Sequence, residues 1–177
     1  MSYWIGFNYS WWYSIVFLIF SYGLNILFKH NFRKRFNNVP YVKFYSETSQ
    51  VLFYLLLVLT LFIELKSIVF LIIGSLIYLA GLGIYISAMY FFAINEYNKI
   101  VTSGVYQLSR HPIYLGFFIM FFGVFISTLN IFVLILNILL AVVSYIIAKE
   151  EEKSCMEMYG VEYKIYKNNV KRIINLF

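Results

Sequence analysis

The sequence predicts an all-α, polytopic membrane protein with about five transmembrane helices, of which the last two form a hairpin followed by a cytosolic helical tail. Of the 177 residues, 62% are hydrophobic and 12% are charged, whereas soluble domains are roughly 45–50% apolar and about 25% charged. Long apolar runs separated by basic intervals account for this composition. At this length we expect one integral-membrane domain, residues 1–177.

The apolar runs set the expected helices, because a transmembrane helix needs about 20 mainly apolar residues. The first run covers Trp11 to Phe28, and the second extends from Val51 to Ile63 after a basic interval. Together with their flanks they form an N-terminal part, residues 1–66, that carries two spans. The third run extends from Ser67 to about Ile94. It opens the remaining part, residues 67–177, which holds the polar motifs.

The stretch from Pro112 to Ile147 contains no charged residue and is too long for a single span at about 1.5 Å per residue. The residues from Ser127 to Asn130 predict a tight turn, so we expect two helices arranged as a hairpin. Beyond Lys149 the charge is mixed, and apolar residues at spacings of three or four predict one buried helical face. Gly160 interrupts this pattern and predicts that one helix ends there before the next begins.

The basic residues predict the orientation and the partners. Of the 14 Lys and Arg residues, all but Lys66 fall on one side of a five-span arrangement. The positive-inside rule then places the N-terminus outside or in the lumen and the C-terminus in the cytosol. The net charge of +6 indicates membrane lipids rather than a nucleic acid as the partner. Cys155 is the single cysteine and the two histidines lie far apart, so no metal site is expected.

Two cationic side chains, Arg110 and His111, stand at the start of the fourth apolar run. Pro112 is typical of the first turn of a helix. The pair therefore lies at a helix N-terminus, where free N–H groups carry positive partial charge. A cation is unfavourable there unless an anion binds, which favours a carboxylate or phosphate ligand. Alternatively, Arg110 simply extends to the lipid headgroups.

Two further features accompany this pair. The acidic run Glu150-Glu151-Glu152 either accepts hydrogen bonds from ligand hydroxyls and a cationic group, or forms a solvated face balanced by nearby lysines. Gly81-Leu82-Gly83 either lets a ligand approach the backbone or allows close helix packing. Donors for an anion at one place and acceptors at another describe a site for a zwitterionic ligand with hydroxyls. S-adenosylmethionine fits this description, whereas ATP would need a glycine-rich phosphate loop that the sequence lacks.

The motifs resemble those of a known family. The stretch SGVYQLSRHPIYLG (103–116), followed after one helical hairpin by EEKSCMEMYGVEYKIYKNNV (151–170), resembles the integral-membrane methyltransferases. These comprise the isoprenylcysteine carboxyl methyltransferases and the phospholipid N-methyltransferases. Cys155 stands where the family pattern has Leu, and Gly81-Leu82-Gly83 resembles a glycine pair of the phospholipid enzymes. The resemblance covers roughly residues 75–172.

This resemblance implies that S-adenosylmethionine is the cofactor and that the acceptor is lipidic or apolar. The acceptor would enter sideways from the bilayer. Arg110 would orient a carboxylate acceptor, and Glu151 or Glu152 would help an amine acceptor to lose a proton. O-methylation of a prenylated cysteine carboxylate is the first expectation, and N-methylation of a phospholipid is the alternative. The residues that would hold the cofactor are Gly81, Gly83, Arg110, His111, Tyr114, Gly116, Glu151 and Glu152.

Two readings from other classes stay open on the sequence alone. Membrane sterol reductases, which use NADPH, look similar in their last third, and Cys155 together with the ending KRIINLF points in that direction. Those enzymes are much longer and have more spans. The other reading is a small non-enzymatic membrane scaffold, in which the polar residues only anchor helix ends.

Overall fold

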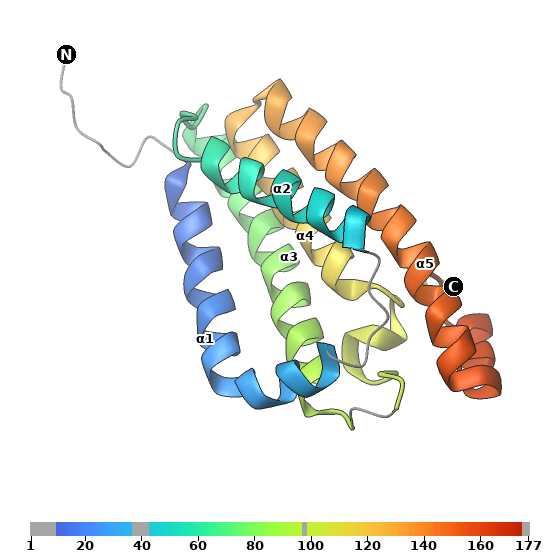
Figure 1. Ribbon diagram of the computed structural model, residues 1–177. Coiled ribbons are helices and arrows are strands. Elements are labelled where there is room, and N and C mark those ends of the chain that lie inside the picture. The colour runs from blue at the N-terminus through green and yellow to red at the C-terminus, as the bar shows by residue number, and fades with distance from the viewer. Residues whose placement is uncertain (1–9, 37–42, 97–98, 175–177) are drawn as a thin grey trace, which may run out of the picture.

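The computed structural model describes residues 10–36, 43–96 and 99–174, with the side chains of 32–36 and 43–46 excepted, and within these residues it contains helices and no strand. Figure 1 shows the helices packed as a bundle. Their bounds are α1 (Trp11–Phe36), α2 (Lys43–Leu59), α3 (Ile68–Ile94), a short 3-10 helix η1 (Gly104–Gln107), α4 (Pro112–Thr128) and α5 (Ile131–Asn169).

Three of the described helices are long and apolar enough to cross a membrane, namely α3, α5 and the Trp11–Asn31 part of α1. The chain is therefore an integral membrane protein. The apolar part of α2, Glu47–Leu59, and the whole of α4 are shorter. With 17 residues, α4 is about 25 Å long against a hydrocarbon core of about 30 Å. The arrangement with five spans therefore stays a prediction.

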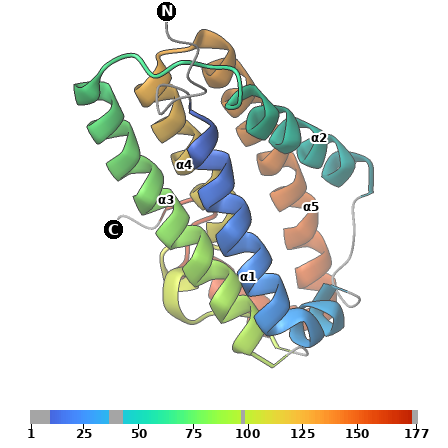
Figure 2. The same cartoon turned by 90° about the vertical axis from the view of Figure 1, so that its left-hand side faces the viewer.

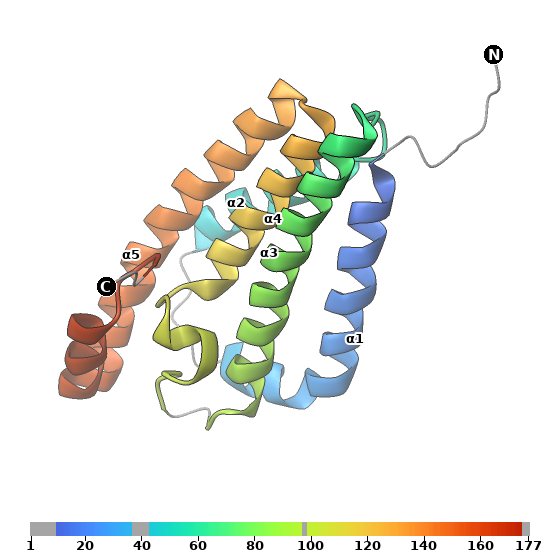
Figure 3. The same ribbon diagram turned by 180° about the vertical axis from the view of Figure 1, so that it is seen from behind.

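Three segments that carry basic residues lie at one end of the bundle. Figures 1 and 3 show that the end of α1, the segment around η1 and the far end of α5 all lie at this end. Helices α3, α4 and α5 alternate in direction, and α2 and α3 lie on opposite sides of α1 in Figure 2. This arrangement is the one that the positive-inside argument requires, although the orientation in the membrane stays a prediction.

The turn between α4 and α5 is confirmed at the expected place. Leu129 ends α4 in the left-handed region with a φ of 48°, and Asn130 caps α5 by accepting hydrogen bonds from the backbone N–H groups of Phe132 and Val133. Asn is one of the preferred N-cap residues because its side chain satisfies N–H groups that have no partner within the helix. A short polar stretch thus divides the long apolar run into a hairpin.

The break at Gly160 is also confirmed. Its φ of 54° and ψ of −121° are not helical, so α5 consists of two helices joined at this kink. The last turns fold back beside the preceding part of α5 (Figure 3). There Tyr163, Tyr166 and Val170 form a small buried cluster, which fixes the chain that follows. The hydroxyl of Tyr166 donates to the carbonyl of Tyr106 at 2.7 Å, and this bond ties the end of α5 to η1.

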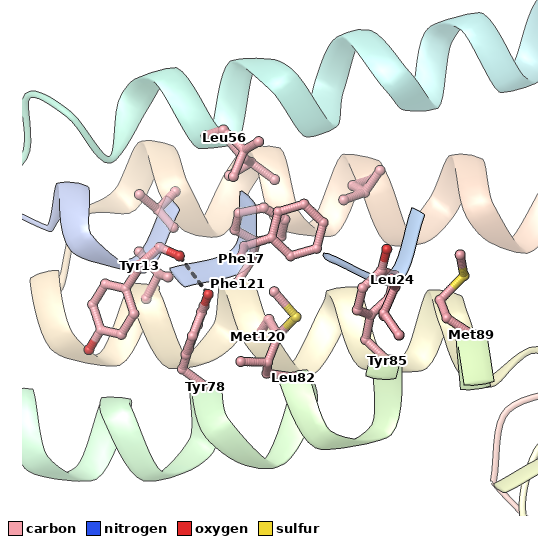
Figure 4. Packing of buried hydrophobic residues seen from close by; sticks show 14 of the residues in the cluster. Tyr13, Phe17, Leu24, Leu56, Tyr78, Leu82, Tyr85, Met89, Met120 and Phe121 are labelled. Atoms are coloured by element: carbon pink, nitrogen blue, oxygen red, sulfur yellow. Dashed lines mark hydrogen bonds between the residues drawn. The ribbon is translucent and has the colours of Figure 1, made fainter. Parts of the chain in front are cut away.

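An aromatic core holds α1 against α3 and α4. Tyr13, Phe17, Tyr78 and Phe121 are buried side by side (Figure 4). The hydroxyl of Tyr78 donates to the carbonyl of Tyr13, the dashed line in Figure 4. The Tyr13 hydroxyl bonds to Ser75 at 3.0 Å. Buried hydroxyls are stable only when they are hydrogen-bonded, so these bonds fix the rings as well as the helices.

Glycines let α3 and α4 approach closely. A Cβ on Gly81 would lie 2.8 Å from the carbonyl oxygen of Gly116, and a Cβ on Gly123 would lie 2.5 Å from the carbonyl oxygen of Gly74. The backbones of the two helices are therefore in contact, as small residues allow in membrane helices. Gly81 and Gly116 thus serve helix packing, one of the two interpretations of the Gly81-Leu82-Gly83 motif.

Gly81 and Gly83 are expected to respond differently to alanine. In Gly81→Ala the new Cβ meets the backbone nitrogen of Met120 at 2.5 Å. Overpacking of this kind costs about 1–3 kcal/mol, or several degrees of Tm for a chain of this size. In Gly83→Ala no atom lies within 4 Å of the new Cβ, so the Tm is unchanged or higher. Thermal unfolding of both variants in detergent measures this, and equal losses would contradict the packing argument.

Candidate functional site

The start of α4 positions the two cationic residues. His111 is the N-cap of α4 and Pro112 is its first residue. The buried Ser109 accepts a hydrogen bond from the backbone N–H of His111 at 3.1 Å and donates one to the carbonyl of Arg172 at 3.1 Å. The backbone N–H of Arg110 donates to the carbonyl of Lys171, also at 3.1 Å. Residues 171 and 172 are therefore hydrogen-bonded to the residues immediately before α4.

Glu152 is the centre of a charged cluster. Its side chain is 2% exposed, and its carboxylate pairs with four cationic or potentially cationic side chains. The Arg172 guanidinium donates to Oε1 at 2.7 Å and to Oε2 at 2.9 Å. Arg110 Nη2 lies 3.2 Å away, His111 Nε2 3.3 Å away and Lys167 Nζ 3.7 Å away. A buried carboxylate with this set of partners is held in its ionised form.

The three consecutive glutamates have different surroundings. Glu151 accepts a hydrogen bond from the Tyr114 hydroxyl at 2.9 Å and lies 3.3 Å from His111 Nδ1. Glu150 instead pairs with Lys153 at the surface, at 2.6 Å. Only Glu151 and Glu152 thus face the start of α4. We call Arg110, His111, Glu151, Glu152, Lys167 and Arg172 the charged cluster.

The environment shifts the pKa values of His111 and Glu152, both of which lie outside the apolar stretches. Burial lowers the pKa of His111, but its bonds and charge interactions with Glu151 and Glu152 outweigh this and raise it above the usual range. Burial raises the pKa of Glu152, but hydrogen bonds from Arg172 and His111 and the charge of Arg110 hold it well below the usual range. Both His111 nitrogens face carboxylates, and only the protonated ring donates from both.

Arg110 has hydrogen-bonding capacity that the described residues leave unused. Its side chain is 8% exposed, and its Nε and Nη1 atoms are buried without a hydrogen-bond partner. Buried polar groups are nearly always hydrogen-bonded, because an unmade bond costs about 1–3 kcal/mol. Donors of a guanidinium suit an anion such as a carboxylate or phosphate, so this residue is suited to a charged ligand.

Two cavities adjoin the charged cluster. The apolar cavity, of about 190 Å³, lies between α4 and α5 and extends from His111 and Arg172 to Phe118 and Ala141. The polar cavity, of about 430 Å³, lies beyond the apolar part of α5 and is lined by Glu152, Arg172, Lys149, Lys153, Met156, Glu157 and Lys167. The site thus has one opening among lipid-facing helices and one among charged residues.

Of the residues predicted from sequence, Arg110, His111, Tyr114, Glu151 and Glu152 are brought together here. Gly81 and Gly116 instead lie at the contact between α3 and α4, and a side chain on Gly83 would enter open space. None of the atoms nearest to a Cβ on these glycines belongs to the charged cluster, and their role in binding a cofactor stays a prediction.

Sequence reasoning missed Arg172 and Lys167, which reach Glu152 from beyond Gly160. Both stand in a stretch of mixed charge in which cations look like ordinary surface residues. The break at Gly160 could have indicated their position. A chain that reverses direction at Gly160 returns the residues that follow to the end of the hairpin, near Glu152.

Stability is expected to depend on pH through His111. Because the folded-state pKa is raised, the stabilisation by its charge is fully present below about pH 6.5 and is lost as the pH rises through the folded-state pKa. His111→Gln should therefore lower the Tm by a few degrees near pH 5.5, and the difference from wild type should shrink towards pH 9. Thermal unfolding in detergent across this range measures it. The exposed His30 provides the control, since His30→Gln should leave the dependence of Tm on pH unchanged. If the difference in Tm between wild type and His111→Gln were the same at every pH, the argument would be contradicted.

Comparison with known proteins identifies the family. The model of the family described as phospholipid methyltransferase matches residues 49–162, which include α3, α4, Arg110, His111, Glu151 and Glu152. No curated protein matches the chain. The matched region covers more than half of the sequence and contains the residues from both motifs that meet at the charged cluster. The chain therefore belongs to the phospholipid methyltransferase family and is a membrane methyltransferase.

Proposed function

We propose that this protein transfers the methyl group of S-adenosylmethionine to an acceptor with an apolar chain that enters from the bilayer. The observation that carries the proposal is the convergence of Arg110 and His111 with Glu151 and Glu152, between a polar and an apolar cavity. Methyl transfer to a lipid needs a charged donor to meet the reactive group of an acceptor with an apolar chain, and this cluster is flanked by a suitable space for each.

The residues present fit S-adenosylmethionine. The unpartnered Nε and Nη1 of Arg110 suit the carboxylate of its amino-acid part, and Glu151 and Glu152 suit its ammonium group and ribose hydroxyls. The polar cavity of about 430 Å³ falls within the range of about 300–1,000 Å³ typical of small-molecule sites. When bound, this cofactor supplies a methyl group that is already activated. Of the residues that would hold it, Glu152 lines this cavity, whereas Arg110, His111, Tyr114 and Glu151 lie next to it, in and beside the charged cluster.

The apolar cavity suits part of a lipid chain. It extends along α4 from His111 to Phe118, about two helical turns into the apolar part of the bundle. Its volume of about 190 Å³ is below the range of about 300–1,000 Å³ for a whole small-molecule ligand. An acceptor would therefore place only the chain segment next to its reactive group there, with the rest among the lipids. Lateral entry from the bilayer follows from this placement.

Two acceptor groups are candidates, each favoured by one observation. In the charged cluster, Arg110, Lys167 and Arg172 outnumber Glu151 and Glu152 even when His111 is neutral, and a positive surplus favours a carboxylate such as that of a prenylated cysteine. The family match favours the amine of a phospholipid. A carboxylate is already ionised at neutral pH, whereas an amine must lose a proton. Glu151 is 27% exposed and Glu152 is 2% exposed. Glu151 is therefore the more accessible of the two for removing a proton from the amine.

The test is to incubate membranes that contain the protein with S-adenosylmethionine labelled in its methyl group. We expect label in the lipid-soluble extract. Alkaline treatment then separates the acceptors, because a methyl ester releases labelled methanol, whereas an N-methyl group keeps its label. Glu152→Gln should abolish incorporation, and Glu150→Gln, which changes a surface residue of the same run, should not.

Absence of both incorporation and S-adenosylmethionine binding would overturn the proposal and favour a non-enzymatic scaffold. A nicotinamide cofactor that copurifies with the protein, detected by mass spectrometry, would instead favour the reductase. Normal activity in Glu152→Gln would leave methyl transfer in place but would refute the assignment of the site.

A further inference from the structure

Arg172 occupies a position between the two cavities. It is the one described residue that lines both the apolar and the polar cavity. Its guanidinium lies 5.0 Å from the centre of the Tyr145 ring and makes two hydrogen bonds to the carboxylate of Glu152. Arg172 therefore forms part of the wall that separates the two spaces.

This wall conflicts with methyl transfer as proposed. A displacement reaction needs the donor methyl carbon and the acceptor atom to be about 3–3.5 Å apart and aligned. If the donor lies in the polar cavity and the acceptor in the apolar one, the group between them must move. The carboxylate of Glu152 is also fully engaged, so a cationic ligand reaches it only when one of its partners leaves.

Arg172 is the partner of Glu152 whose departure would join the two cavities. Its side chain is 22% exposed, compared with 8% for Arg110, so its charge is resolvated more easily than a fully buried one. Glu152 would keep Arg110, His111 and Lys167. Lys167 is more exposed, but at 3.7 Å it makes a weaker contact and does not line the apolar cavity.

The segment that carries Arg172 is held by hydrogen bonds of its backbone and of the Arg172 side chain. Ser109 donates to the carbonyl of Arg172, and the backbone N–H of Arg110 donates to the carbonyl of Lys171. Val170 is buried against the tyrosines of the last helical turns, whereas Ile173 is 52% exposed. A segment with few buried contacts opens locally at low free-energy cost. Figure 3 shows it returning along α5 at the end of the chain.

We propose that Arg172 acts as a gate: it holds Glu152 in the empty protein, and the cationic part of the methyl donor displaces it, which joins the polar cavity to the apolar cavity. Arg172 is thus a positioning residue that makes acceptor access depend on the donor. This inference rests on the proposed function, since it takes the donor to be S-adenosylmethionine.

The first test compares ligand binding by wild type and Arg172→Gln, measured calorimetrically in detergent. A residue that competes with the ligand weakens its binding, so Arg172→Gln should bind S-adenosylmethionine about two- to fivefold more tightly, the range for a partly exposed ion pair. S-adenosylhomocysteine keeps the ammonium group that Glu152 would bind and should gain by a similar factor. Arg172→Lys, which keeps the charge, should resemble wild type, and Lys171→Gln, a change at the exposed neighbour, is the control.

The second test needs no variant and therefore does not depend on how Arg172→Gln folds. Hydrogen exchange of residues 170–174 in the wild-type protein is followed by mass spectrometry with and without S-adenosylmethionine. We expect exchange to become faster when the ligand binds. Slower or unchanged exchange, or weaker binding by Arg172→Gln, would overturn the gate and make Arg172 a ligand-binding or purely structural residue. Failure of wild type to bind the ligand would instead refute the proposed function, and the gate with it.

Discussion

Replacing Glu152 with alanine is expected to destabilise the protein more than any other single change at the site. The carboxylate is 2% exposed and has four cationic partners, among which Arg110 is itself 8% exposed. Its removal leaves a buried guanidinium without a counter-charge, and breaking a buried pair in this way costs about 3–5 kcal/mol. For a chain of this size the loss corresponds to a fall in Tm on the order of 10 °C, measured by thermal unfolding in detergent.

The neighbouring glutamate supplies the control. Glu150 pairs with Lys153 at the surface, where their side chains are 38% and 68% exposed, and such pairs contribute about 0–1 kcal/mol. Glu150→Ala should therefore shift the Tm by at most about 2–4 °C. Similar losses in the two variants would mean that Glu152 is not the charge that holds the cluster together.

The hairpin and the kink were predictable because local residues determine them. Asn130 satisfies free N–H groups at the start of α5 with its own side chain, and Gly160 adopts a positive φ. Such preferences act within a few residues and need no knowledge of the tertiary structure. The number of spans was less predictable, since α4 has a length at the lower limit for crossing a membrane.

The charged cluster was predictable only in part. Arg110 with His111, and Glu151 with Glu152, stand in motifs whose order suggested that they would meet. Arg172 stands outside both methyltransferase motifs, in the ending KRIINLF, and its partner Glu152 lies 20 positions earlier, beyond the kink at Gly160. A contact of this kind depends on the path of the chain after the kink, which side-chain periodicity does not specify.

The glycines confirm the packing interpretation for Gly81 and extend it to further positions. Gly74 and Gly81 on α3, and Gly116 and Gly123 on α4, are each seven residues apart. This spacing places each pair on one helix face, where their backbones come into contact. The closer pair Gly81 and Gly83 resembles a family feature, but only Gly81 lies at the contact between α3 and α4.

Replacing Arg110 with alanine is expected to have the opposite profile from Glu152→Ala, with a small effect on stability and a large one on function. Glu152 would retain Arg172, His111 and Lys167 as partners, so the fold keeps its counter-charges. The Nε and Nη1 donors, which have no partner in the described residues, would be lost to the ligand. Hydrogen bonds to a charged group contribute about 1.5–3 kcal/mol, so S-adenosylmethionine binding should weaken about 10- to 100-fold.

Calorimetric titration and thermal unfolding of the same Arg110→Ala preparation separate these two effects. Arg110→Lys should recover little of the affinity, because an ammonium group does not reproduce the planar, two-pronged donor of a guanidinium. If Arg110→Ala bound the ligand normally but unfolded as readily as Glu152→Ala, Arg110 would be only a counter-ion within the fold. A loss of affinity at nearly unchanged Tm would instead show that the buried donors of Arg110 bind the ligand. A purely structural role of Arg110 predicts the reverse, a lower Tm at unchanged affinity.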